Sequence, residues 1–583
     1  MKKIWKLKKL YPDQGTGECQ DLDIFISEIR NLKAKVQIPD KLLRILYSRG
    51  ITDYVKVVKF FKPTADKLYD PFLMKDTDKA VERIITAVNN KEKVMVLGDY
   101  DVDGTCGASM LYLFLKHFGV YSDVYIPDRI REGYGISISS IDNAKNTGIT
   151  LIIAVDCGIT AFDKVEYAKE QGLDFIICDH HQPPDHIPDA LAVLDPLRKD
   201  CTYPFKYLCG AGVAFKLIQA VCSKLNQPEF ALKLLDFVAI ATSSDIVPIT
   251  DENRILVNEG FKLINKNPRP SIKTLLDKVG LKTVNINTTN IVYTVAPRIN
   301  AVGRLGDARR AVELLTSDNP AELKELAAVL DSENTNRREI DKSITEAAFK
   351  IFESGNGNGN AINHYSIVLH NEDWHPGVIG IVAARLVEKY NLPSIVMTTV
   401  NGVAKGSARS INGFNIYEAL KKCEDKLIQF GGHCHAAGLE ISLENIDEFR
   451  EFFNAIAEDE LKKQEILPEI DIDTDLEFDE INHTFLNLLE FFEPYGPGNS
   501  VPVFVTKGVE IVGTPRFVKS DTALFRLKDG EAKQNFDAVF FSSKDYHEKI
   551  ETGAFCNICY SLDKSVWNGR QSIKLRIKDM QFI

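Results

Sequence analysis

Three short apolar runs in the first third of the chain each end in acidic residues. They are residues 94–97 before Asp99, residues 151–155 before Asp156, and residues 175–178 before Asp179. A continuous run of valine, isoleucine and leucine predicts a strand that is buried on both faces, as in a parallel sheet. The carboxyl ends of parallel strands meet at one edge, where open α/β sheets bind their ligands. The pattern therefore predicts an α/β fold with carboxylates gathered at that edge.

The acidic residues have a spacing that suits metal binding. Asp99, Asp101 and Asp103 alternate within five positions, His180 and His181 follow Asp179, and Asp245 ends a further apolar run. Gathered carboxylates repel one another unless a cation lies between them. Imidazole and carboxylate together suit Mn²⁺, Mg²⁺ or a related ion, and we expect only one of the two adjacent histidines to ligate directly.

A solvated acidic loop is the alternative interpretation for any one of these segments alone. Four separate segments, however, supply the five or six ligands that a two-metal site requires. Such sites hold two ions about 3.5–4 Å apart and activate water for in-line attack at phosphorus. The combination predicts a centre that hydrolyses phosphate esters.

Composition limits the class of protein. The chain has 583 residues, 44% hydrophobic and 26% charged, which predicts a soluble globular protein of two to four domains. No apolar run approaches the ~20 residues of a membrane span, and the basic N-terminus lacks the apolar region of a secretory signal. The net charge of −11 excludes a protein that coats nucleic acid by charge alone, but it leaves room for a local basic channel.

The cysteines indicate a reducing compartment. There are eleven, scattered along the chain without the spacing of a disulfide framework, so we expect a cytoplasmic protein. Cys556 and Cys559 form a lone CxxC in a strand-like segment. Because no second pair stands at zinc-finger spacing, a structural role is favoured over metal binding.

The order of predicted elements divides the chain into five parts. Strand-like runs at 94–98, 123–127, 151–156, 175–179 and 191–195 alternate with helical stretches, as in a doubly wound parallel sheet. Short alternating runs at 501–505, 509–512, 523–527, 537–541, 554–560 and 573–577 predict a small β-barrel of the OB type. We expect a helical preface over 1–65, a catalytic domain over 66–318, a linking helix and Gly/Asn joint over 319–360, a smaller α/β domain over 361–465 and the barrel over 466–583.

Clusters of arginine and glycine outside the acidic segments are candidates for phosphate binding. Arg129 precedes a glycine-flanked Tyr134, which could stack a base, although a surface loop with a packed tyrosine fits the same composition. One further cluster contains Arg298, Asn300 and Arg304, and another contains Ser407 and Arg409. Arginine binds phosphate through a bidentate fork, and glycine permits close approach of the backbone. His433 and His435 have no carboxylate or cysteine beside them, so hydrogen bonding or packing is favoured over metal binding.

Several motifs together resemble a known superfamily. DYDVDG at 99–104, DCG at 156–158, DHH at 179–181 and SD at 244–245 resemble the successive motifs of the DHH phosphoesterases. With Arg129, EGYG at 132–135, PRIN at 297–300, the Gly432–His433 cluster and EPYGPGN at 493–499, the chain is similar to one branch, the RecJ family. The resemblance covers essentially the whole chain and implies a DHH domain, a linking helix, a DHHA1 domain and an OB-fold. It also implies a single-stranded-DNA-specific 5′–3′ exonuclease that releases 5′ mononucleotides in DNA recombination and repair.

The resemblance assigns roles to individual residues. It implies that two Mn²⁺ or Mg²⁺ ions are bound by Asp101, Asp103, Asp156, His180 and Asp245. Asp156, on the central strand, is expected to bridge the ions; Asp179 and His181 support the site, and Asp99 is expected only to orient its neighbours. Arg298, Asn300 and Arg304 would grip the backbone near the scissile bond, and Ser407 and Arg409 the terminal 5′ phosphate. The remaining expected substrate contacts are Arg129, Tyr134, His375 and His433.

Two other functions share the metal motifs. A pyrophosphatase or short-oligonucleotide phosphodiesterase would have little use for the barrel, and a non-catalytic nucleic-acid scaffold would have lost metal ligands that this chain retains. The expected partner is single-stranded DNA, bound by a monomer in a cleft too narrow for duplex. A single-strand-binding protein and a helicase are candidate protein partners, and no association with a membrane is expected.

Overall fold

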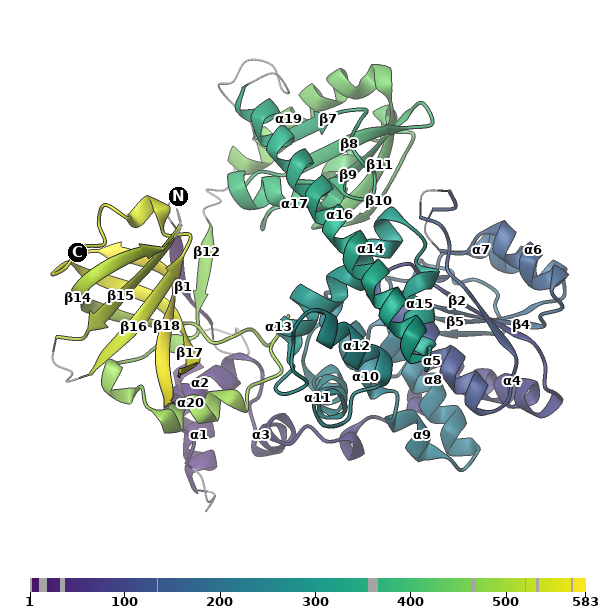
Figure 1. Cartoon of the computed structure of the whole chain (residues 1–583), viewed down its shortest axis with the longest axis horizontal. Coiled ribbons are helices and arrows are strands. Elements are labelled where there is room, and N and C mark those ends of the chain that lie inside the picture. The colour runs from purple at the N-terminus through teal and green to yellow at the C-terminus, as the bar shows by residue number, and fades with distance from the viewer. Residues whose placement is uncertain are drawn as a thin grey trace. The chain divides into compact units, whose positions relative to one another are not determined.

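The computed structural model describes residues 3–9, 18–31, 37–129, 131–133, 135–354, 365–462, 468–518, 521–530, 534–567 and 570–583. They form two compact units (Figure 1). The larger unit comprises Asp70–Asp245 and Gly260–Ile466, and the barrel unit comprises Met1–Tyr69, Ile246–Glu259 and Leu467–Ile583. The limits of the five predicted domains stay a prediction.

The larger unit begins with the predicted parallel sheet. Its strand order is β3-β2-β4-β5-β6, and all neighbouring strands are parallel. The strands are β2 (Val94–Gly98), β3 (Ser122–Tyr125), β4 (Leu151–Val155), β5 (Asp174–Cys178) and β6 (Ala192–Leu194). Every residue of β2 and β4 is buried, because helices cover both faces.

Helices flank this sheet on two sides (Figure 1). On one side, α6 and α7 pack apolar residues onto the strands, among them Ile141 and Val165. On the other side lie α4, α5 and α8, and α8 contacts both α4 and α5. Their bounds are α4 Thr77–Asn90, α5 Val102–His117, α6 Ile138–Asn146, α7 Phe162–Glu170 and α8 Gly210–Lys224. The predicted doubly wound α/β arrangement is confirmed.

A helical region follows and ends in a long helix. Its members are α9 (Pro228–Leu232), α10 (Leu235–Ser244), α11 (Asp251–Lys266), α12 (Pro270–Lys278), α13 (Thr288–Asn290), α14 (Ala296–Leu305) and α15 (Arg309–Thr316). The predicted linking helix is α16, Pro320–Glu353, with Pro320 in its first turn and Asn319 as its N-cap. The Gly/Asn joint after it lies outside the described residues.

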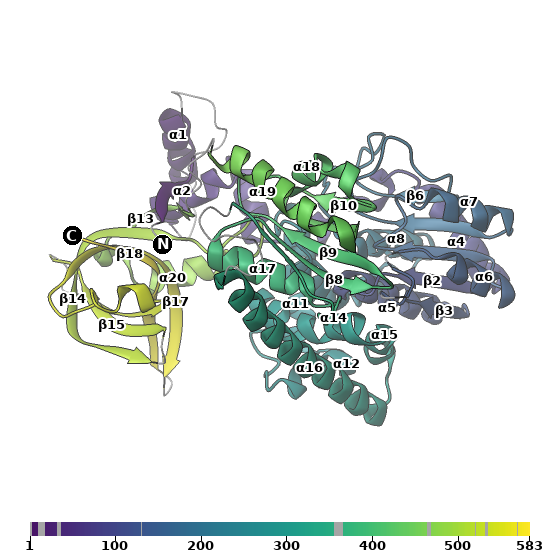
Figure 2. The same ribbon diagram turned by 90° about the horizontal axis from the view of Figure 1, so that it is seen from above.

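The second sheet of the larger unit is mixed. Its order is β10-β11-β9-β8-β7, with only the β7–β8 pair parallel. Figure 2 shows α16 and α17 on one side of it and α18 and α19 on the other. The bounds are β7 Ile367–His370, α17 Ile379–Tyr390, β8 Ser394–Val400, β9 Val403–Arg409, α18 Ile416–Lys421, β10 Gln429–His433, β11 Ala436–Ser442 and α19 Ile446–Lys462. This is the smaller α/β domain that the sequence predicts.

The barrel unit contains the predicted OB-type barrel. Its strands are β14 (Phe504–Val518), β15 (Thr522–Lys528), β16 (Asn535–Phe541), β17 (Phe555–Trp567) and β18 (Arg570–Phe582). β14 pairs with both β15 and β17, which closes the barrel, and β16 pairs with β18 in parallel. Cys556 and Cys559 are buried in β17, in keeping with a structural role.

The prediction of separate strands at 501–505 and 509–512 is wrong. One strand, β14, begins at Phe504 and continues to Val518, with irregular register after Thr506 and Val512. Gly508 and Gly513 have φ of 68° and 71°, a conformation that glycine adopts easily and that allows a bulge within a continuous strand. Gly508, which lies between the two predicted runs, therefore marks a bulge.

The N-terminal preface, which the sequence predicts to be helical, is helical only in part. It begins with strand β1 (Ile4–Leu7), which pairs in parallel with β12 (Glu469–Ile472). Helices α1 (Glu18–Asn31), α2 (Asp40–Ser48) and α3 (Tyr54–Phe61) follow. β1 has no local partner, because its neighbour in the sheet is β12, near the other end of the chain. The unit also contains β13 (Thr474–Asp475) and α20 (His483–Glu490).

Within the described ranges, no helix combines the length and the apolar character that crossing a membrane requires.

Candidate metal centre and phosphate pocket

A tight loop joins β2 to α5 and carries the first three aspartates. Asp101 is the N-cap of α5, and its Oδ1 accepts hydrogen bonds from the backbone N–H groups of Asp103 (2.9 Å) and Gly104 (3.0 Å). A Cβ at Gly104 would lie 2.4 Å from the backbone N and O of Asp99. The loop can therefore be this short only because residue 104 has no side chain.

The N-terminus of α8 holds Asp103 in place. The two carboxylate oxygens of Asp103 accept hydrogen bonds from the N–H groups of Gly210 (2.6 Å) and Ala211 (2.8 Å). A Cβ at Gly210 would lie 2.6 Å from the Cβ of Asp156. This helix end therefore brings the carboxylates that follow β2 and β4 close to each other.

His180 lies among three carboxylates. Its Nε2 is 3.1 Å from Oδ1 of Asp156 and 3.7 Å from Oδ2 of both Asp103 and Asp245. Asp156 directly follows β4 with a left-handed φ of 62°, and Asp245 is the C-cap of α10. The residues come from four separate segments of the chain, as the sequence predicts.

Asp179 organises the two histidines. Its Oδ2 accepts a hydrogen bond from the N–H of Ile159 (2.9 Å), and its Oδ1 contacts Nδ1 of His181 (2.7 Å) and the N–H of His180 (2.8 Å). Burial lowers the pKa of His181, but the hydrogen bond and charge of Asp179, together with the charges of Asp103 and Asp245, outweigh burial and raise that pKa to about 9. Asp179 is thus occupied by protein donors, as expected for a supporting residue.

The carboxylates of the centre are in an unfavourable environment. Burial, followed by repulsion from neighbouring carboxylates, raises the pKa of Asp103 to about 6 and raises that of Asp156 well above its usual value. Burial and the charge of Asp101 raise the pKa of Asp99 in the same way. Oδ1 of Asp99 is buried without a hydrogen-bond partner among the described residues. A divalent cation would relieve both the repulsion and the unpaired oxygen, so the donor set fits a metal.

The donor atoms form groups of metal-binding size. Each group has three ligand atoms within 4.8 Å of one another: Asp99, Asp101 and Asp156; Asp103, His180 and Asp245; and Asp156, His180 and His181. The structure thus brings together all six predicted catalytic residues. It adds Asp99, which the sequence analysis left out of the ligand set although its alternation with Asp101 and Asp103 at a strand end was the available signal.

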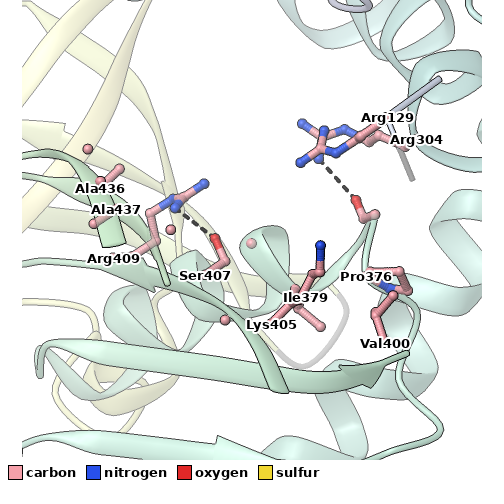
Figure 3. Close-up of a pocket in the computed structure, with 16 residues that line it drawn as sticks. Arg129, Arg304, Pro376, Ile379, Val400, Lys405, Ser407, Arg409, Ala436 and Ala437 are labelled. Carbon is pink, nitrogen blue, oxygen red and sulfur yellow. Dashed lines mark hydrogen bonds between the residues drawn. The ribbon is translucent and has the colours of Figure 1, made fainter. Parts of the chain in front are cut away.

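A basic pocket of about 610 Å³ lies in the same unit. Four of its lining residues are cations, namely Arg129, Arg304, Lys405 and Arg409, and none is acidic. Figure 3 shows Arg129 and Arg304 facing Arg409 and Ser407 across the opening. Much of the remaining lining is glycine and alanine, which lets a ligand approach the backbone.

Repulsion between the arginines shows that the pocket concentrates positive charge. Burial, and after it the charges of Arg129, Arg337 and Arg409, lowers the pKa of Arg304 to about 10. Arg304 donates to the carbonyl of Gly377 (3.1 Å), and Arg409 donates to Oγ of Ser407 (3.0 Å). Because like charges are held together without a lining carboxylate, the pocket suits an anion such as phosphate.

The other predicted substrate residues that the structure describes do not line the basic pocket. Arg298 forms an ion pair with Asp331 (2.9 Å) and Asn300 accepts from the N–H of Val102 (3.1 Å), so neither lines the pocket. His375 accepts a hydrogen bond from the N–H of Gly377 (3.0 Å) beside the pocket. His433 is exposed at the end of β10, and Tyr134 lies outside the described residues. Lys405, which begins the same sequence cluster as Ser407 and Arg409, also lines the pocket.

Comparison with known proteins places the chain in a family. Family models match residues 93–242 (DHH family, N-terminal domain), 362–459 (DHHA1 domain) and 472–579 (RecJ OB domain). The single-stranded-DNA-specific exonuclease RecJ of Bacillus subtilis strain 168 is 35% identical over 555 residues, which are 95% of this chain and 69% of that protein. The chain belongs to the RecJ family. The RecJ of Haemophilus influenzae is 33% identical, over 77% of this chain and 81% of the relative.

A solved RecJ structure agrees over nearly the whole length. The crystal structure of RecJ in complex with Mn²⁺ from Thermus thermophilus has a TM-score of 0.83 and 26% identity, covering 99% of this chain and 79% of that chain. A second exonuclease RecJ, bound to manganese, has a TM-score of 0.57 and 32% identity over 66% of this chain and 94% of the other. The predicted order of DHH, DHHA1 and OB domains is confirmed.

Proposed function

We propose that this chain is a single-stranded-DNA-specific exonuclease that hydrolyses phosphodiester bonds with two Mn²⁺ or Mg²⁺ ions. The observation that carries the proposal is the partly buried centre of five aspartates and two histidines, in which the pKa values of Asp99, Asp103 and Asp156 are raised and Oδ1 of Asp99 has no hydrogen-bond partner among the described residues. Its RecJ relatives are named as exonucleases of this specificity, and one was solved with Mn²⁺.

The donor groups would hold one ion each. Asp99, Asp101 and Asp156 form one group, and Asp103, His180 and Asp245 form the other. Asp156 belongs to the first group and lies 3.1 Å from His180 of the second, so it is the residue best placed to serve both. Ions held there lower the pKa of water and neutralise charge on the phosphoryl oxygens.

The basic pocket sets the end of the strand from which digestion begins. We propose that Arg409, Ser407 and Lys405 bind the terminal 5′ phosphate, so that the first phosphodiester bond lies at the metal centre and 5′ mononucleotides are released in the 5′–3′ direction. Arg129 supports this arrangement, because it lines the pocket while its guanidinium lies 4.9 Å from the ring of Tyr100, between Asp99 and Asp101 in sequence. Pocket and metal loop are thus neighbours within one unit.

The alternatives from the sequence analysis fit less well. The match to the RecJ OB domain over 472–579 favours a polymer substrate over pyrophosphate or a short oligonucleotide. The complete set of ligands favours an enzyme over a scaffold. We further propose a monomer that acts in the cytoplasm in DNA recombination and repair, with a single-strand-binding protein and a helicase as partners. Free thiols among the described residues, such as the buried Cys157 and Cys178, support a reducing compartment.

The direct test is the variant Asp156→Ala, assayed on labelled single-stranded and duplex DNA with Mn²⁺ and with chelator. We expect the wild type to digest only the single strand, and only with the ion. Loss of the shared ligand is expected to lower kcat by at least about 1,000-fold, roughly 4 kcal/mol of barrier, while binding of single strands changes little.

The matched control is Asp189→Ala, an exposed aspartate that pairs with Lys169. It should retain wild-type turnover. Turnover of Asp156→Ala near that of the control would contradict the proposed centre.

A further inference from the structure

A small cavity in the barrel unit has no role in the function proposed above. It has a volume of about 270 Å³ and lies where the end of β16 meets β18. Its lining includes three cations, Lys3, Arg576 and Lys578, together with several aromatic rings. All of these residues belong to the barrel unit. We call this cavity the barrel pocket.

An irregularity in β18 brings two of the cations to the barrel pocket. Lys578 is the extra residue of a bulge, because its two neighbours in β18 pair with consecutive residues of β17, Cys559 and Tyr560. A bulge bends the strand and redirects the side chain at that position. Arg576 precedes the bulge, and both cations line the cavity beside the end of β16 at Phe541. The backbone of β18 therefore holds two cations together at one place.

The three cations of the barrel pocket have no carboxylate to neutralise them. Among the residues that the structure describes, none of the three forms an ion pair. Partial burial lowers the pKa of Lys578, and the charges of Arg576 and Lys3 lower it further. Positive charge that is gathered around a cavity attracts an anion to it.

The carboxylates near the barrel pocket do not change this balance. Asp579, which follows Lys578 in β18, is 3% exposed and accepts hydrogen bonds from Nε1 of Trp5 (2.7 Å) and from the hydroxyl of Tyr546 (2.5 Å). Asp545 is the one carboxylate in the described lining, and it is exposed to solvent. Three cations against one carboxylate leave the lining with a net positive charge.

Aromatic rings give the barrel pocket an apolar wall. Phe541 is 49% exposed, and the guanidinium of Arg576 lies 5.2 Å from the centre of its ring. Phe540 and Tyr546 pack against each other in the same wall, with ring centres 5.1 Å apart. An exposed aromatic ring beside an arginine is typical of the anchor points of protein–protein interfaces.

The size of the barrel pocket and the charge around it favour a peptide over a nucleic acid. Its volume of about 270 Å³ is below the roughly 300–1,000 Å³ of pockets that hold drug-sized ligands, so it suits one or two side chains better than a nucleotide. Residues 467–583 contain 13 lysines and arginines but 19 aspartates and glutamates. This negative balance opposes a polyanion laid along the barrel, whereas a short acidic segment can reach the pocket alone.

We propose that the barrel pocket binds an acidic peptide segment of a protein partner. A carboxylate of the peptide lies among Lys3, Arg576 and Lys578, and an adjacent apolar side chain of the peptide packs against Phe541. The inference uses residues of the barrel unit alone, so it does not depend on the metal centre or on the proposed exonuclease activity.

The test is binding of a fluorescein-labelled, aspartate-rich peptide that ends in two phenylalanines to the full-length protein, measured by fluorescence anisotropy. The double variant Arg576→Ala/Lys578→Ala should bind this peptide at least about 10-fold more weakly than the wild type, because two charge-assisted contacts are lost. Binding by the wild type should also weaken as NaCl is raised from about 50 mM to about 200 mM, since salt screens exposed charges.

Two controls isolate the barrel pocket and the charge of the peptide. Lys507→Ala removes an exposed cation of β14 that does not line the pocket, and it should bind the peptide as the wild type does. The same peptide with asparagine in place of aspartate should bind the wild type at least about 10-fold more weakly. Lys578→Ala alone carries the test if the double variant fails to fold, and it should still lower the affinity several-fold.

Three results would overturn the inference. The first is that the wild type does not bind the acidic peptide. The second is that folded Arg576→Ala/Lys578→Ala, or Lys578→Ala, binds it as tightly as Lys507→Ala does. The third is that an oligothymidylate, added with chelator so that it stays intact, displaces the peptide from the wild type and itself binds the double variant more weakly. That result would assign the barrel pocket to nucleic acid.

Discussion

Asp103 illustrates how one residue serves both the fold and the chemistry. It is 2% exposed, accepts two backbone hydrogen bonds from the start of α8 and lies 3.7 Å from His180. Those bonds fix the position of its oxygens, while burial makes its charge unfavourable in the absence of a cation. The carboxylates of the metal-free site therefore repel one another, and a bound cation would remove that repulsion.

This predicts a pH-dependent stabilisation by metal. Because the pKa of Asp103 is raised from 3.8 to about 6 in the folded protein, the folded state binds the proton more tightly than the unfolded state. The contribution of this group to metal-free stability is therefore lost as pH rises from about 4 to 6. Mn²⁺ binds the deprotonated form, so the increase in Tm on adding Mn²⁺ should grow over the same range and beyond it, since the pKa of Asp156 is also raised well above its usual value.

Thermal unfolding with and without saturating Mn²⁺, from about pH 5 to about pH 8, measures this dependence. In Asp103→Asn the increase in Tm should be smaller and should vary less with pH. An increase in Tm that is the same at every pH would contradict the raised carboxyl pKa values.

At the scale of the element, α14 connects the metal loop with the pocket. Asn300 accepts from the N–H of Val102 (3.1 Å), and a Cβ at Gly303 would lie 2.3 Å from the carbonyl oxygen of Tyr100. Arg304, at the end of the same helix, lines the pocket. The helix thereby fixes the separation between the metal loop and the basic pocket.

Asn300→Ala tests whether α14 acts by positioning. The change leaves the N–H of Val102 without its acceptor, which lowers the stability of the folded state by about 1–3 kcal/mol. The metal loop also loses a contact that fixes its position. We expect kcat to fall roughly 10-fold or more with little change in KM for single-stranded DNA. Asn146→Ala, an exposed position at the end of α6, is the control. A raised KM with unchanged kcat would instead support the grip on DNA that the family resemblance implies.

Sequence patterns predicted those elements whose signal is local. The strands β2, β4 and β5 were found because each is a continuous apolar run, and the donors at their carboxyl ends followed from sheet geometry. β1 was missed because its partner β12 is distant in sequence. The contact of Arg298 with Asp331 and that of Asn300 with Val102 could not be predicted either. In each pair the two residues are far apart in sequence and meet only in the folded chain.

At the scale of the whole molecule, the protein has a net charge of −11 but collects four cations in one pocket. Such a distribution repels polyanions in general and attracts them at one place. The pocket should therefore matter most for a strand that carries a terminal phosphate.

This predicts that Arg409→Ala discriminates between strand ends. A charge-assisted hydrogen bond to the phosphate contributes about 1.5–3 kcal/mol of binding free energy. Its loss should raise KM roughly 10–100-fold for a 5′-phosphorylated single strand. The effect should be much smaller for a strand with a 5′ hydroxyl. Lys169→Ala, an exposed cation on α7, serves as the control. Equal effects on the two strands would show that Arg409 does not bind the terminal phosphate.

The most direct test of the proposed exonuclease is digestion of two labelled single strands, one blocked at its 5′ end and one at its 3′ end, with Mn²⁺ and with chelator. We expect release of 5′ mononucleotides from the 3′-blocked strand alone, and only when Mn²⁺ is present. Release from the 5′-blocked strand, or digestion that persists in chelator, would contradict it.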